Sequence, residues 1–126
     1  MTGYRPKKRL GQNFLRSQVV VEKLVELIDP QPDERIVEIG PGRGALTAAL
    51  AASGAPITAV EFDRDLMAGL AKLTEKHSNL EILNQDFLNY TPPPGSLKLV
   101  GNIPFNITSP VIDWAVRYRS SITRAV

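Results

Sequence analysis

Apolar residues recur along this chain with two different spacings. Short apolar runs of strand length occupy residues 35–39, 57–61, 80–84, 97–101 and 122–126. Before and between them, apolar residues recur every three or four positions, which is the period of an amphipathic helix. These helical segments cover about 17–28, 45–52, 63–77 and 109–118. Strands that alternate with helices predict an α/β fold with a parallel, doubly wound sheet.

Capping residues mark the ends of these segments. Ser17 and Asp63 suit helix N-caps, Gly54 suits a helix end, and Ser109 before a proline suits a third N-cap. We expect residues 85–95 to form a loop and His77 to be an exposed cap or loop residue. The apolar helix faces predict the following core residues: Val20, Val21, Leu24, Val25, Ile28, Leu66, Leu70, Leu73, Trp114 and Tyr118.

Right-handed crossovers give the first four strands the order 3-2-1-4. The chain reverses direction between strands 1 and 4, and ligands of such sheets bind at that point, outside the carboxyl ends of the strands. Strand 1 runs into a glycine-rich turn at residues 40–44, and strand 4 runs into Asn-Ile-Pro-Phe at residues 102–105. We therefore expect these two peptides to face one crevice.

The turn at residues 40–44 has glycine at three alternate positions, Gly40, Gly42 and Gly44. Alternate glycines allow a sharp turn and let a ligand lie against bare main chain. The following helix start offers unpaired N–H groups. The turn predicts a nucleoside-type cofactor and leaves nicotinamide cofactors and S-adenosylmethionine both open; a tight turn without ligand is the alternative.

Acidic residues follow or lie within three of the strands. Glu61 ends strand 2, nineteen residues after Gly42, where a carboxylate can accept from both ribose hydroxyls. Asp86, with Phe87 as an apolar wall, can accept from an adenine amino group, or it can be a turn residue that bonds its own backbone. Glu38 can bind a ligand amine directly or through water, or it can bond N–H groups of the loop.

The peptide at residues 102–105 suits a nucleobase amine as substrate. The Asn102 side-chain oxygen and a backbone carbonyl at Ile103 or Pro104 can accept the two N–H groups, which aims the nitrogen lone pair at an electrophile. Phe105 can stack on the base, a contact worth about 1–3 kcal/mol. Positioning then supplies most of the catalysis. The alternative is a proline-containing strand exit with a core phenylalanine.

Composition narrows the classes of protein. The 126 residues include no cysteine and one histidine, so we expect no disulfide, no cysteine-based zinc site and no histidine metal cluster. No apolar run reaches the length of a membrane span and no signal peptide is visible, so we expect a cytoplasmic protein with no membrane or metal partner. Residues 1–11 lack periodicity and form a basic arm; they hold four of the five basic residues that precede the first acid. The arm can meet nucleic acid or remain a solvated tail.

Five motifs, in this order, give the chain a resemblance to a known family. They are residues 8–15, 38–47, 60–63, 85–88 and 101–107. Over residues 8 to about 118 the sequence resembles the rRNA adenine N6,N6-dimethyltransferases, the KsgA group with its eukaryotic and mitochondrial relatives.

The resemblance implies a Rossmann-like fold, S-adenosyl-L-methionine as cofactor, and dimethylation of two adjacent adenines of small-subunit rRNA within a pre-30S-type particle. It implies that residues 12–126 are the cofactor-binding part of the methyltransferase domain. The implied cofactor residues are Gln12, Asn13, Leu15, Glu38, Gly40, Gly42, Glu61, Phe62, Asp86, Phe87 and Asn102. Asn102, Pro104 and Phe105 would hold the target base, and Lys7, Lys8 and Arg9 would contact RNA.

Two departures from the family pattern keep alternatives open. The usual small-subunit motif is Asn-Leu-Pro-Tyr, and the Asn-Ile-Pro-Phe found here is commoner in the related Erm enzymes, which methylate large-subunit rRNA. Family members also continue beyond this length, so we expect a domain truncated within its fifth strand. Such a fragment leaves Leu97, Leu99 and Val100 on an uncovered edge and can associate with itself.

Two further functions use the same fold. A non-catalytic RNA-binding factor of ribosome assembly would keep the basic arm but has no need of the intact 102–105 peptide. A nicotinamide-dependent oxidoreductase would use the glycine turn and Glu61, but nothing in its chemistry calls for Asn102.

Overall fold

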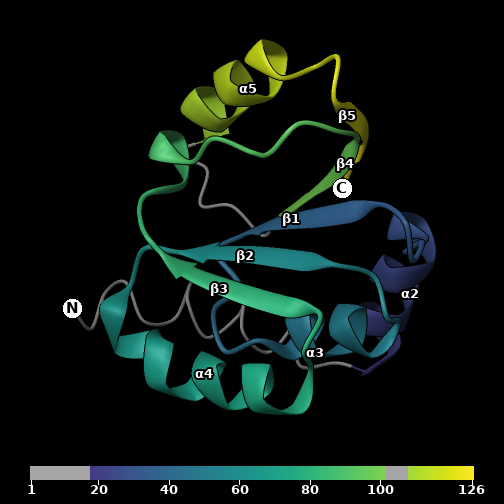
Figure 1. Cartoon of the computed structure of the whole chain (residues 1–126), viewed down its shortest axis with the longest axis vertical. Helices are drawn as coiled ribbons and strands as arrows, with labels where there is room; N and C mark the ends of the chain where they lie inside the picture. Colours follow the sequence, from purple (N-terminus) through teal and green to yellow (C-terminus); the bar gives the residue numbers. More distant parts are fainter. Residues whose placement is uncertain (1–17, 102–107) are drawn as a thin grey trace.

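The computed structural model describes residues 18–101 and 108–126, which form a parallel sheet with helices on both faces (Figure 1). The strands are β1 (Arg35–Ile39), β2 (Ile57–Glu61), β3 (Leu80–Asn84), β4 (Leu97–Gly101) and β5 (Ile122–Ala125). The helices are α2 (Gln18–Ile28), α3 (Ala45–Ala52), α4 (Met67–Lys76) and α5 (Thr108–Arg117), with short 3₁₀ helices η1 (Arg64–Leu66) and η2 (Phe87–Asn89).

The sheet has the order β3-β2-β1-β4-β5, with every recorded pair parallel. The predicted order 3-2-1-4 is therefore confirmed, and β5 extends it beside β4. Ile39 at the end of β1 pairs with Val60 of β2 and with Gly101 of β4. The glycine turn and the exit of β4 thus leave the sheet from neighbouring positions, as the topology argument requires.

The predicted boundaries differ from the structure in three places. Asp63 caps η1 rather than an α-helix, because its carboxylate accepts from the Asp65 N–H at 2.9 Å, and α4 begins only at Met67. The predicted loop 85–95 contains η2, which Asp86 caps in the same way. The third helix cap is also misplaced: α5 begins at Thr108, so Ser109 lies inside it. Ser17 lies outside the described residues, and His77 is the partly exposed C-cap of α4.

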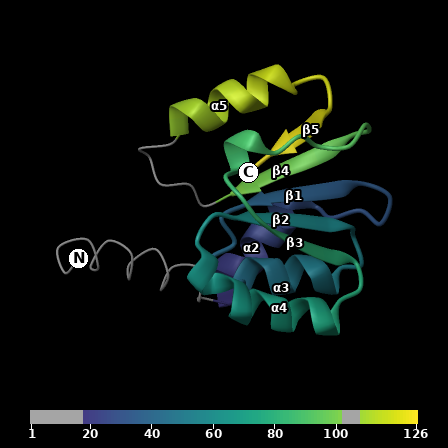
Figure 2. The ribbon, with the colours of Figure 1, turned by 60° about the vertical axis from the view of Figure 1, so that its left-hand side comes forward.

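The two faces of the sheet are covered unequally. Helices α2, α3 and α4 lie against the first face, and α5 with η2 lies against the second (Figure 2). The first face buries Ile36, Ile57 and Val100 against Val21 and Ile28 of α2, together with residues of α3. The predicted face of α2 is confirmed there, with its remaining apolar residues only partly buried.

An aromatic cluster packs against the second face of the sheet. Trp114 of α5 is buried, and its ring centroid lies 4.4 Å from that of Phe87 and 4.5 Å from that of Tyr118. The Trp114 indole N–H donates to the Tyr90 carbonyl at 2.9 Å, so the polar atom of this buried ring is satisfied. The predicted core role of Trp114 is confirmed, and Tyr118 packs against the same cluster while remaining partly exposed.

A buried lysine joins α2 to the sheet. The Lys98 ammonium group, on a side chain only 6% exposed, donates to the carbonyl of Ile28 at 2.8 Å and to that of Asp29. Its nitrogen also lies 3.7 Å from a Glu34 carboxylate oxygen. A cation at a helix C-terminus complements the helix dipole and the unpaired carbonyls there. Lys98 therefore fixes the end of α2 beneath β4.

The predicted edge at Leu97, Leu99 and Val100 is wrong. All three side chains are buried, and β5 covers that side of β4. The backbone N–H of Leu97 donates to Ser121, and the N–H of Val126 donates to Leu99. Residues 122–125 form the pairing strand, so β3 and β5 are the outer strands of the sheet within the described residues.

We expect Lys98→Met to lower the free energy of unfolding by about 3 kcal/mol, because two helix-end carbonyls and Glu34 lose their buried donor while the aliphatic volume is kept. Urea denaturation measures the change. Lys72→Met on exposed α4 is the matched control, with an expected change within about 0.5 kcal/mol. Equal stabilities of the two variants would contradict the structural role of Lys98.

Candidate functional site

The glycine turn connects β1 to α3 through three left-handed residues. Gly40, Gly42 and Gly44 have φ angles of 62°, 62° and 90°. Residues with a Cβ rarely adopt such positive values. A Cβ on Gly44 would also lie 2.7 Å from a methyl carbon of Leu73, whereas one on Gly40 or Gly42 would meet no atom of the described residues within 4 Å. Gly44 thus allows α3 to pack against α4, and the other two leave the outer side of the turn open.

Glu61 joins this turn to the end of β2. Its side chain is 7% exposed, and its Oε1 accepts from the Gly42 N–H at 3.1 Å while Oε2 accepts from the Asp63 N–H at 2.9 Å. We call this pair of hydrogen bonds the Glu61 bridge. Each carboxylate oxygen has a second lone pair, so the bridge leaves acceptor capacity for a ligand. The ribose role of Glu61 stays a prediction.

The backbone beside Glu61 is held from β3. The Asn84 side-chain amide donates to the Glu61 carbonyl at 2.9 Å and to the Phe62 carbonyl at 3.3 Å. Phe62 follows with a side chain 75% exposed, which is unusual for so large an apolar group. The sequence analysis did not single out Asn84; its position at the end of β3, level with Glu61, is the available signal.

Glu38 lies beneath the same turn, on the first face of β1. Its side chain is only 3% exposed, and its Oε1 accepts from the Thr47 hydroxyl of α3 at 2.6 Å. Its recorded partner is thus a side chain of α3 rather than the N–H groups of the loop. Burial raises the pKa of Glu38 to about 7; the Thr47 hydrogen bond opposes the rise and the nearby Glu61 carboxylate adds to it.

Asp86 and Phe87 both make contacts within the protein. Asp86 accepts from the Leu88 N–H at 3.0 Å, which is the turn contact that the sequence left as one of two interpretations. Its Oδ2 has no hydrogen bond within the described residues, so the adenine role stays a prediction. Phe87 is buried against Trp114 in the aromatic cluster.

The remaining predicted site residues lie outside the part of the chain that the structure describes. They are Lys7, Lys8, Arg9, Gln12, Asn13, Leu15, Asn102, Pro104 and Phe105.

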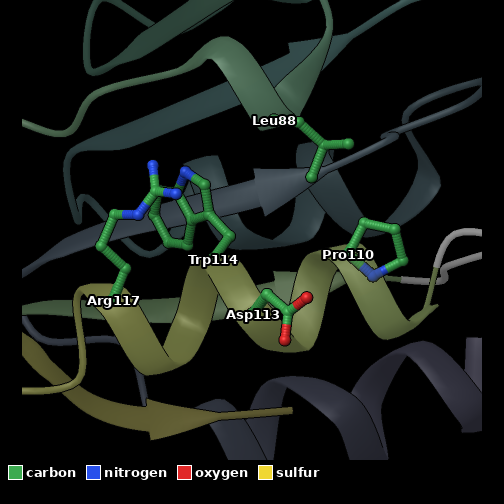
Figure 3. A pocket seen from close by; sticks show the side chains of 5 residues that line it. All are labelled: Leu88, Pro110, Asp113, Trp114 and Arg117. Carbon is green, nitrogen blue, oxygen red and sulfur yellow. The ribbon is translucent and has the colours of Figure 1, made fainter.

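Two surface pockets lie within the described part of the chain. One, of about 230 Å³, lies between η2 and α5, with Leu88 facing Pro110, Asp113, Trp114 and Arg117 (Figure 3). The other, of about 290 Å³, lies beside the glycine turn and is lined by Arg43, Asp65, Leu66, Gly69 and Leu70. Among the residues that the structure describes, none of the predicted cofactor residues lines either pocket.

Residues 18–101 and 108–126 contain no group of three or more His, Cys, Asp or Glu side chains that could hold a metal ion. None of their helices is both long enough and apolar enough to cross a membrane.

The pKa of Glu38 gives the ligand-free protein a pH-dependent stability. The pKa of this carboxyl rises from 4.5 to about 7 on folding, so below pH 4.5 its ionisation does not affect the free energy of unfolding. Between pH 4.5 and about pH 7 the ionisation lowers the free energy of unfolding progressively, and above that range the loss is complete. We expect Glu38→Gln to raise the free energy of unfolding at pH 8 by up to about 3 kcal/mol, with the gain vanishing near pH 4.5. Urea denaturation across this range measures it. The exposed Glu75→Gln on α4 is the control, and a gain independent of pH would contradict the account.

Comparisons with known proteins identify the family of the chain and its fold. The profile of the family described as "Ribosomal RNA adenine dimethylase" matches residues 3–126. "Ribosomal RNA small subunit methyltransferase A" of Hahella chejuensis (strain KCTC 2396) is 38% identical over 125 residues, covering 95% of this chain and 46% of the relative. "rRNA adenine N-6-methyltransferase" of Saccharopolyspora erythraea is 38% identical over 112 residues, covering 89% and 29%.

A solved structure gives the same result. The 23S rRNA methyltransferase ErmE is similar with a TM-score of 0.77 and 36% identity, covering 89% of this chain and 46% of that one. The chain thus spans about half the length, or less, of the relatives it matches. The predicted Rossmann-like methyltransferase fold and the family resemblance are confirmed, and the chain belongs to the ribosomal RNA adenine dimethylase family.

Proposed function

We propose that the chain is the cofactor-binding part of an S-adenosylmethionine-dependent rRNA adenine N6-methyltransferase. The observation that supports this most directly is the Glu61 bridge. It holds a carboxylate and a bare glycine turn together at the sheet edge where ligands of this fold bind. A sugar diol needs such an acceptor, and an extended ligand tail needs the open main chain.

The charges at the turn favour a cationic ligand over a phosphorylated one. Glu38 and Glu61 are both buried, lie close enough for their charges to interact, and form no salt bridge with any described residue. S-adenosylmethionine brings a sulfonium and an ammonium group to this place. A nicotinamide cofactor would bring an anionic pyrophosphate, which the two carboxylates would repel. The oxidoreductase alternative is therefore disfavoured.

The proposed contacts follow the cofactor from end to end. Glu38 accepts from the ammonium group, Gly40 and Gly42 lie along the methionine part, and Glu61 binds the ribose hydroxyls. Phe62, with its exposed ring, covers one side of the adenine, and the Asp86 Oδ2 accepts from the adenine amine, with Phe87 behind it. Gln12, Asn13 and Leu15 close over the cofactor in this proposal.

The bound cofactor supplies an electrophilic methyl group. Asn102 and Pro104 accept the N–H groups of the target adenine, and Phe105 stacks on its ring, so that the nitrogen lone pair points at the methyl carbon. The proton leaves after alkylation, so a strong general base is unnecessary, and alignment lowers the barrier. Lys7, Lys8 and Arg9 contact RNA phosphates, which fixes the base relative to the site.

We assign small-subunit rRNA, in a pre-30S-type particle, as the substrate. The relative from Hahella chejuensis is named as a small-subunit methyltransferase. Two observations favour a large-subunit substrate as the second candidate: the Asn-Ile-Pro-Phe form of residues 102–105, and the likeness to ErmE.

We expect Glu61→Ala to weaken S-adenosylmethionine binding at least tenfold, because the ribose loses its acceptor and the Gly42 and Asp63 N–H groups lose theirs. Isothermal titration calorimetry measures the affinity. Glu75→Ala on exposed α4 is the control and should bind as the parent does. Unchanged affinity of a folded Glu61→Ala protein would remove Glu61 from the site, and tighter binding of NAD than of S-adenosylmethionine by the parent would contradict the proposed cofactor.

In a protein of the relatives' length that contains this sequence, we expect Asn102→Ala to lower the methylation rate at least tenfold with little change in cofactor affinity, because Asn102 acts mainly on the base. Undermethylated small and large ribosomal subunits with labelled cofactor provide the assay. Methylation of large subunits alone would establish the second candidate, and methylation of neither would favour the non-catalytic RNA-binding factor. The 126-residue chain by itself is expected to bind cofactor weakly and to transfer methyl groups slowly.

A further inference from the structure

Thr47 is the one polar residue of α3, whose other side chains are alanine and leucine. It is fully buried, and its hydroxyl donates to the Glu38 carboxyl at 2.6 Å. Burying a hydroxyl in an apolar helix face costs free energy unless the hydroxyl is hydrogen-bonded. The hydrogen bond to Glu38 offsets that cost for Thr47. Alanine or valine would fill this helix face without that cost.

Glu38 is incompletely satisfied by the protein. A carboxylate can accept about four hydrogen bonds; Glu38 accepts one, at Oε1, and its Oε2 has no partner within the described part of the chain. The described elements around it offer no cation: Glu61 faces it from β2, Val100 lies beside it on β4, and Thr47 faces it from α3. A nine-tenths-buried acid with one free oxygen beneath an open turn is suited to a cationic ligand group.

We propose that Thr47 is a positioning residue for the cofactor, whose hydroxyl orients the Glu38 carboxyl so that Oε2 accepts from the ammonium group of the bound amino-acid part, with release of a proton from Glu38 on binding. The inference rests on the proposed function, because it takes S-adenosylmethionine as the ligand. In this binding step the neutral carboxylic acid of Glu38 and the ammonium group of the ligand form a carboxylate–ammonium pair. One proton passes from Glu38 to the buffer.

The pKa of Glu38 sets the pH range of this coupling. With a pKa near 7, the carboxyl is about half protonated in the free protein at neutral pH, and the paired carboxylate of the complex is not. Affinity should therefore rise from pH 6 to pH 8. The Thr47 hydrogen bond lowers the pKa, so its loss should move the midpoint of this rise to higher pH.

The test compares two ligands on four proteins. S-adenosylhomocysteine has the amino-acid part and 5′-methylthioadenosine lacks it, and both share the adenosine. The proteins are the parent, Thr47→Val, Thr47→Ser and the control Thr74→Val, whose hydroxyl donates only to the α4 backbone. Calorimetry at pH 6, 7 and 8, in two buffers of different ionisation enthalpy, gives affinities and the number of protons released.

We expect the parent to release about half a proton at pH 7 with S-adenosylhomocysteine and none with 5′-methylthioadenosine. Thr47→Val should bind S-adenosylhomocysteine about tenfold more weakly at pH 7 and 5′-methylthioadenosine normally, with its pH midpoint moved upward. Thr47→Ser, which keeps the hydroxyl, and Thr74→Val should behave as the parent.

Several results would overturn the inference. A parent that binds S-adenosylhomocysteine without proton release overturns it even if Thr47→Val does not fold. An equal loss for both ligands in Thr47→Val would make the threonine a structural residue only. A parent that binds neither ligand at any pH refutes the proposed function itself, which is a distinct outcome.

Discussion

The carboxylate of Glu61 is the contact on which the candidate site depends. One oxygen accepts from the Gly42 N–H and the other from the Asp63 N–H, so a single side chain fixes the glycine turn after β1 and the exit of β2. Both donors are backbone groups at left-handed or capping positions that would otherwise need water. The site is therefore preorganised by a residue that has acceptor capacity left for a ligand, and ordering the turn need not be repeated at each binding event.

A second carboxylate would give the proposed site a preference for cationic ligands. Glu38 lies beneath the turn, and burial raises its pKa to about 7, with a smaller contribution from the Glu61 carboxylate. Burial of a like-charged pair costs free energy in the ligand-free protein. In the proposed complex, a positive ligand group at Oε2 would remove much of that cost and so favour binding. The same two carboxylates would repel a ligand that brings phosphates to the turn.

Periodicity and capping residues predict most of the sheet, because its strands are short, apolar and separated by clear turn signals. The bounds of β1, β2, β3 and β4 agree with the predicted ranges, and Glu61 occurs at the predicted strand end. The cap at Asp63 predicts a helix start but not its type, since an Asx cap serves a 3₁₀ turn equally well. The Thr47–Glu38 hydrogen bond is invisible to such patterns because it depends on the rotation of α3 against the sheet, which tertiary packing decides.

The charged side chains at the two ends of the sheet differ in their partners. Those at the amino ends of the strands are paired, whereas the carboxylates at the candidate site have no cation among the described residues. At the amino ends of the strands, Lys98 is buried with the carbonyls of Ile28 and Asp29 and with Glu34, and Arg124 of β5 donates to the Leu27 carbonyl. These contacts connect α2, β4 and β5 with their cations paired. At the carboxyl ends, Glu38 and Glu61 lack a cation among the described residues. The ligand-free protein therefore bears the cost of two buried carboxylates at the carboxyl ends of the strands, and a bound cation there would stabilise the folded state.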